Sequence, residues 1–109
     1  MPIQHKELAA GRWQSMTFAE QMGNIGSEIN RAAAWQGKDE ELFTGAIVRA
    51  LELMDFTIQD PRWRMRLKEL ARAREMICDA YTGGHGYRAS LPELDRYFFS
   101  FAFLARRDK

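Results

Sequence analysis

The chain has 109 residues, of which 46% are hydrophobic, with 16 Lys and Arg against 15 Asp and Glu. This length suits one folded domain with a single hydrophobic core, not a core plus a second folded unit. The near-neutral charge balance excludes the broad positive field that draws proteins to nucleic acid or to anionic membranes, so we expect neither partner.

The cysteine, histidine and hydropathy patterns exclude several further classes. Cys78 is the only cysteine, which excludes an intramolecular disulfide and a cysteine-based zinc site and is typical of a reducing compartment. We interpret it as a small hydrophobic side chain. No signal segment or membrane span is visible, so we expect a soluble, cytoplasmic protein. Neither His5 nor His85 follows a Glu by three residues, as a di-iron bundle requires, so we expect no metal and no cofactor.

Residues 1–15 contain scattered apolar side chains and are interpreted as a short packed helix or a loose arm. After them, Thr17 and Glu20 form a capping box that satisfies free backbone N–H groups, so a helix is expected over 18–36. Gly23 and Gly26 inside it each cost about 1 kcal/mol relative to Ala, which indicates the close approach of another helix. Its apolar seam consists of Phe18, Met22, Ile25, Ile29, Ala32 and Gln36.

Three more helices follow at short intervals. Asp39 can cap a helix over 40–58, and Asp60 followed by Pro61 predicts a third over 61–81. A capping box of Ser90 and Glu93 predicts a fourth that ends near Arg106. Four amphipathic helices with short connections favour an all-α, up-down-up-down four-helix bundle over 16–109, preceded by the arm at 1–15. The apolar seams contain Phe43, Ile47, Ala50, Met54 and Ile58, then Trp63, Leu67, Leu70, Ile77 and Tyr81, then Leu94, Phe98, Phe101 and Ala105.

The third predicted helix has the most unusual charge pattern. Six Arg or Lys and two Glu lie between 61 and 78, whereas 39–60 has six Asp or Glu and one Arg, so the two helices are expected to attract each other. At 100 degrees per residue, Arg74 falls inside the apolar stripe, where a charge needs a partner. Glu28 and Asp55 are the candidate partners for a structural ion pair.

The alternative for Arg74 is a functional site. Arginine side chains bind phosphate with two parallel hydrogen bonds, so Arg74 and Arg66 could hold an anion. The glycine-rich loop at 82–88 would then add His85 and Tyr87, which could transfer protons. No complete catalytic motif accompanies these residues, so no catalytic residue is assigned.

The fourth helix has more apolar surface than one bundle can bury. Phe99 and Phe103 lie on the side opposite Leu94 and Phe101, while Phe56 falls outside the main stripe of its own helix. Either the arm, with Ile3, Leu8 and Trp13, covers this surface or a second subunit does. We expect a homodimer built partly on the fourth helix, with the arm contributing and with Phe56, Phe99 and Phe103 at its interface.

Two resemblances add to this interpretation. The segments MTFAEQMGNIGSE at 16–28, RALEL at 49–53 and LKELARARE at 67–75 resemble a family of small, uncharacterised bacterial all-helical proteins, over about 16–105. By architecture the chain also resembles HEPN-type domains, some of which are nucleases and some of which pair with nucleotidyltransferases. HEPN nucleases use an Arg followed four to six residues later by a His, and here the residues that far before His85 are Asp79, Ala80 and Tyr81. The resemblance therefore implies a noncatalytic role as the partner of another protein.

Two functions remain open from the sequence. The first is a noncatalytic, homodimeric interaction module that binds a protein partner, for which a nucleotidyltransferase is one candidate. The second is a small enzyme or binding protein for a phosphate-containing or nucleotide ligand, held by Arg66, Arg74 and the loop at 82–88. The second requires Arg74 to open onto a cleft that faces this loop.

Overall fold

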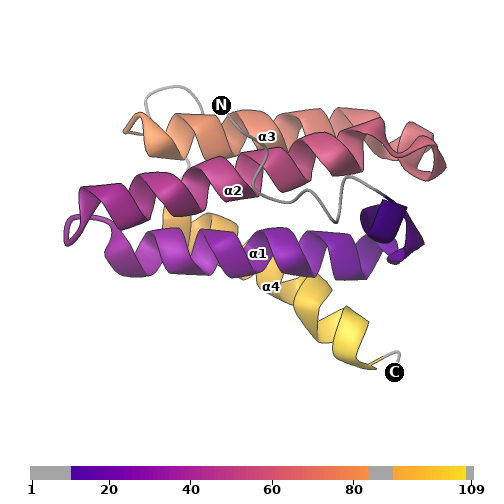
Figure 1. Ribbon diagram of the computed structural model, residues 1–109, viewed down its shortest axis with the longest axis horizontal. Coiled ribbons are helices and arrows are strands. Elements are labelled where there is room, and N and C mark those ends of the chain that lie inside the picture. The colour runs from indigo at the N-terminus through magenta and orange to yellow at the C-terminus, as the bar shows by residue number, and fades with distance from the viewer. Residues whose placement is uncertain (1–10, 84–89, 108–109) are drawn as a thin grey trace.

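The computed structural model describes residues 11–83 and 90–107 (Figure 1). All regular structure within these residues is helical, which confirms the predicted all-α class. The elements are two 3-10 helices and four α-helices: η2 (Trp13–Ser15), α1 (Phe18–Trp35), α2 (Glu40–Gln59), η3 (Pro61–Arg66), α3 (Leu67–Tyr81) and α4 (Leu91–Arg107). None of the described helices combines the length and the apolar composition that a membrane span requires.

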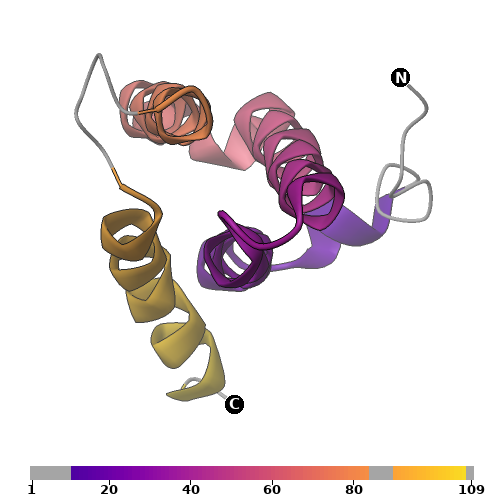
Figure 2. The same cartoon turned by 90° about the vertical axis from the view of Figure 1, so that its left-hand side faces the viewer.

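Successive helices run in opposite directions, which confirms the four-helix bundle (Figure 1). The most extensive contacts of α1 are with α4 and α2, and α3 packs against α2. By contrast, α3 and α4 have few contacts with each other. The end view shows α3 and α4 separated on one side of the bundle (Figure 2). The position of α4 therefore depends mainly on α1.

The helices begin at the side chains that the sequence predicts. Thr17 and Glu20 form a complete capping box at the start of α1, and Asp39 accepts a hydrogen bond from the backbone N–H of Leu42 at the start of α2. At the start of α4, the hydroxyl of Ser90 accepts from the backbone N–H of Glu93. The Glu93 carboxylate also binds this hydroxyl, at 3.1 Å. These local caps explain why the predicted boundaries agree closely with the observed ones.

The third helix differs from the prediction, because 61–81 is not one continuous α-helix. Asp60 and Pro61 do begin a helical segment, but this segment is the 3-10 helix η3, and Trp63 within it has a non-helical backbone (φ −104°, ψ 21°). A 3-10 turn advances 120 degrees per residue instead of 100 degrees. Extrapolation from Trp63 into α3 therefore holds only in part. Leu70 and Ile77 of the predicted seam are buried, but Leu67 and Tyr81 are 40% and 43% exposed. The other buried residues of α3 are Ala73 and Ala80.

The close helix approach predicted from Gly23 and Gly26 is confirmed, because these glycines lie where α1 crosses α4. A Cβ atom on Gly26 would lie 2.7 Å from Cβ of Phe98, and one on Gly23 would lie 3.1 Å from Cα of Ala102. Real Cβ atoms essentially never approach to 2.7 Å, and 3.1 Å is closer than nine in ten of their contacts. The two helix backbones can meet at this crossing because α1 has no side chains there.

The described part of the N-terminal arm is packed onto the bundle. Trp13 is fully buried and belongs to the same core cluster as Met22, Met54 and Phe98. The core therefore includes residues that precede the expected boundary at residue 15. Ile3 and Leu8 lie outside the described residues.

Candidate functional site

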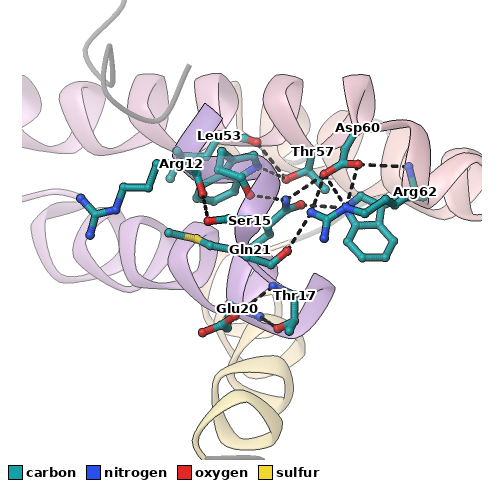
Figure 3. Close-up of polar contacts among 12 residues, drawn as sticks. Arg12, Ser15, Thr17, Glu20, Gln21, Leu53, Thr57, Asp60 and Arg62 are labelled. Carbon is teal, nitrogen blue, oxygen red and sulfur yellow. Dashed lines mark hydrogen bonds and ion pairs between the residues drawn. The ribbon is translucent and has the colours of Figure 1, made fainter. Parts of the chain in front are cut away.

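A buried polar network lies where η2, α1 and the junction between α2 and η3 meet (Figure 3). The indole N–H of Trp13 donates to Oγ1 of Thr57 at 3.0 Å. Gln21 donates through Nε2 to the backbone carbonyl of Trp13 at 2.8 Å and to Oδ2 of Asp60 at 3.1 Å. Its Oε1 accepts from the indole N–H of Trp63 at 2.9 Å. Gln21 thus links four segments of the chain.

The charged part of this network is the pair formed by Asp60 and Arg62. Asp60 is 2% exposed and accepts hydrogen bonds from the backbone N–H of Arg62 at 3.0 Å and from its Nη2 at 2.7 Å. The same Nη2 donates to the backbone carbonyl of Met16 at 2.8 Å. The Arg62 side chain outweighs the effect of burial and lowers the pKa of Asp60 to about 2. The carboxylate therefore remains ionised at neutral pH.

This network has the properties of a structural connection between segments of the chain and not those of a catalytic site. Among the described residues, every buried side-chain nitrogen and oxygen atom has a hydrogen-bond partner. A carboxylate with a pKa of about 2 holds no proton to donate at neutral pH. The sequence analysis did not predict this network. One signal was present, because Gln21 follows Phe18 by three residues and precedes Ile25 by four. This spacing places the polar Gln21 side chain on the apolar face of the helix.

Arg74 lies at the contact between α2 and α3, not in the interior of the bundle. Its Nε donates to Oδ1 of Asp55 at 2.7 Å, and the two side chains are 38% and 45% exposed. Nη1 of Arg74 also lies 3.7 Å from Sγ of Cys78, which is half-buried. The prediction of a central apolar position was wrong, because its two reference residues do not mark the apolar face of α3: Trp63 lies in the 3-10 segment before this helix, and Tyr81 is 43% exposed. The guanidinium instead reaches the edge of the helix pair, where solvent reaches it.

The other members of the expected anion site have different surroundings. Arg66 pairs with Glu69 at 3.4 Å, and its guanidinium lies 4.0 Å from the ring centre of Phe18. Arg66 and Arg74 therefore have separate carboxylate partners. His85 and Tyr87 lie outside the described residues. Glu28, the second partner considered for Arg74, is bound instead by Arg31 and by Nε of Arg49 at 2.9 Å.

The C-terminal half of α4 has the most exposed aromatic surface. Phe99 is 59% exposed and Phe103 is 55% exposed, whereas the fully or almost fully buried residues of α4 all lie before Phe99. Phe56, the third expected interface residue, is half-buried and packs against the core. The described part of the arm does not cover the α4 aromatics, since Trp13 is buried next to Thr57.

Two grooves flank α4. The groove between α1 and α4 has a volume of about 800 Å³, and Phe99 and Ala102 line its α4 side. The groove between α3 and α4 is larger, about 1140 Å³, and is lined by Met65, Met76 and Tyr97 among others. Its floor is bridged by a hydrogen bond from the Tyr97 hydroxyl to Oε1 of Glu69 at 2.8 Å. Burial and this neighbouring carboxylate raise the pKa of Tyr97.

Within the part of the chain that the structure describes, no group of three or more His, Cys, Asp or Glu side chains could hold a metal ion. Comparison of the chain with protein-family models, curated proteins and solved structures finds no match.

Proposed function

We propose that this protein is a noncatalytic interaction module of the cytoplasm that forms a homodimer through α4 and binds a protein partner. A nucleotidyltransferase is the partner that the HEPN resemblance suggests. The observation that carries the proposal is the exposure of Phe99 and Phe103, at 59% and 55%, on one side of α4. Contiguous exposed aromatic surface of this kind marks protein interfaces in other proteins.

The groove between α3 and α4 supports binding of a second protein. Met65 at its edge is 95% exposed, and its neighbour Leu67 is 40% exposed. Methionine side chains are flexible and polarizable, and they are frequent on surfaces that adapt to a partner. The charges of Arg66 and Glu69 in this groove already neutralise each other. An apolar segment can therefore enter without leaving these two charges unpaired.

The first test is self-association. The wild-type chain of 12.7 kDa is expected to sediment as a dimer, and a variant with both Phe99→Ser and Phe103→Ser as a monomer. The free energy of unfolding of the isolated chain should change little, because both rings are more than half exposed. Leu42→Ser is the matched control, since Leu42 is 44% exposed but belongs to α2. A wild-type chain that stays monomeric at every concentration would refute the dimer.

The second test addresses the protein partner. Tagged wild-type chain and a Met65→Glu variant are used to capture proteins from the native host. We expect the wild type and Leu42→Ser to capture one partner at a fixed ratio of partner to tagged chain. Met65→Glu should lose this partner, because the new carboxylate would be desolvated in the occupied groove. Met65 is 95% exposed, so the substitution should leave the fold intact, as circular dichroism can verify. Identical captured proteins for all three chains would contradict a role for this groove.

A further inference from the structure

The groove between α1 and α4 is lined by one stripe of residues from each helix, and also by Arg12 and Met16 before α1. Each stripe begins with an acidic residue and ends with an arginine eleven positions later. Such a stripe covers one side of a helix over three turns, about 16 Å. The stripes are Glu20, Gly23, Asn24, Gly26, Ser27, Asn30 and Arg31 on α1, and Asp95, Phe98, Phe99, Ala102, Ala105 and Arg106 on α4.

The two helices run in opposite directions, so the two stripes place one acidic residue and one arginine at each end of the groove, and Arg12 before α1 also lines it. At one end, Asp95 of α4 accepts hydrogen bonds from Asn30 of α1 at 3.2 and 3.4 Å, next to Arg31. Glu20 and Arg106 line the other end. The close crossing of Gly26 with Phe98 lies about midway between Glu20 and Arg31 on α1, and three residues after Asp95 on α4. Along each helix, the charge therefore changes from negative to positive between the two ends of its stripe.

We propose that this groove is a two-fold interface in which a second copy of the chain packs α4 antiparallel to α4. The proposal rests on the homodimer proposed above and specifies its geometry. A two-fold axis across α4 between Phe99 and Ala102 places Asp95 opposite Arg106 of the partner subunit, and Arg106 opposite the partner's Asp95. The same operation brings Arg31 to the partner's Glu20. An isologous interface requires this kind of self-complementarity, since one patch must match itself.

The distribution of apolar side chains agrees with this orientation. Phe99 lines the groove, and Phe103 lies one turn further along α4. Antiparallel packing of α4 on α4 places Phe99 and Phe103 next to the same side chains of the second copy. The polar stripe of α1 then faces the polar stripe of α1 in the second copy. Arg96 and Arg107 are exposed, lie on the flank of α4 away from α1 at 100 degrees per residue, and do not line the groove. They remain in solvent in this arrangement.

Charge reversal provides a test that does not depend on any single variant. Asp95→Arg alone sets two arginines against each other at both symmetric contacts, and Arg106→Asp alone sets two carboxylates against each other. We expect each variant to self-associate at least about tenfold more weakly than the wild type, as measured by sedimentation equilibrium. An equimolar mixture of the two variants should form a heterodimer, because Arg at position 95 then faces Asp at position 106 and the wild-type pair is kept at the other contact.

The mixture also separates this inference from the proposed function. Restored association in the mixture supports the antiparallel arrangement and shows that both variants fold. A wild-type dimer with unchanged association in both variants, or a mixture that associates no better than its components, overturns the arrangement while the homodimer itself stands. A wild-type chain that does not associate refutes the homodimer, and this inference with it. Raised salt should weaken the wild-type dimer, because exposed ion pairs are screened.

Discussion

Replacing Asp60 with Ala is expected to lower the free energy of unfolding by about 3 kcal/mol, because a charged hydrogen-bond acceptor is lost from a buried position. The carboxylate caps η3 and binds Gln21 and the Arg62 side chain. Its loss removes the acceptor of hydrogen bonds from Nε2 of Gln21 and from the backbone N–H of Arg62. The penalty stays below the upper values known for buried pairs, because the Arg62 side chain is 40% exposed and water can solvate it.

Urea unfolding at several pH values measures this effect. The pKa of Asp60 falls from 3.8 to about 2 on folding, so its contribution of about 2 kcal/mol is complete above pH 4 and is lost as the pH falls towards 2. The Asp60→Ala variant should lack this part of the acid sensitivity. If the variant lost stability with the same pH profile as the wild type, the carboxylate would not be the ionised group of the network.

Two controls have matched chemistry in less buried places. Asp39→Ala removes a carboxylate that caps α2 through Leu42 but lies nearer the surface, and should cost about 1 kcal/mol. Arg74→Ala breaks the pair with Asp55, whose side chains are 38% and 45% exposed, and should cost less than about 1 kcal/mol. A loss for Arg74→Ala as large as that for Asp60→Ala would mean that Arg74 lies deeper than the structure places it.

The fold could be predicted from the sequence because its signals are local. Thr17 with Glu20, and Asp39 with its following turn, determine helix starts through contacts within three residues. The pair Asp60 and Pro61 also predicts a helix start, but it does not tell an α-helix from a 3-10 helix. The 3-10 conformation is accompanied by tertiary contacts, in which Arg62 binds Met16 and Trp63 binds Gln21. They join positions more than forty residues apart in the sequence, which local patterns do not detect.

The same limit explains the position of Arg74. A helical wheel assumes a constant angle per residue. The non-helical backbone of Trp63, two residues after the predicted helix start at Pro61, breaks this assumption. The exposed rings of Phe99 and Phe103 could be found from the sequence, since no break interrupts α4 between them and Leu94. The sequence therefore does not predict the long-range polar network, whereas it does predict the exposed face of one regular helix.

Replacing Gly26 with Ala is expected to destabilise the protein by about 2 kcal/mol, although Ala favours helices over Gly by about 1 kcal/mol. The new Cβ would lie 2.7 Å from Cβ of Phe98. Both atoms are fixed to their backbones, so no side-chain rotation relieves the contact. The helices α1 and α4 must separate, and Phe98, which is fully buried, then loses part of its packing.

Two further glycines allow this effect to be measured against matched controls by thermal and urea unfolding. Gly45→Ala on α2 should stabilise the protein by about 0.5 to 1 kcal/mol, because its Cβ would meet only the flexible end of Arg49 at 3.5 Å. Gly23→Ala should fall between the two, since its Cβ would lie 3.1 Å from Cα of Ala102. An equal gain for all three substitutions would show that the α1 and α4 backbones do not meet closely. The stability order Gly45→Ala, Gly23→Ala, Gly26→Ala would instead locate the closest approach at Phe98, which lines the proposed dimer groove, so separating the helices there should also weaken self-association.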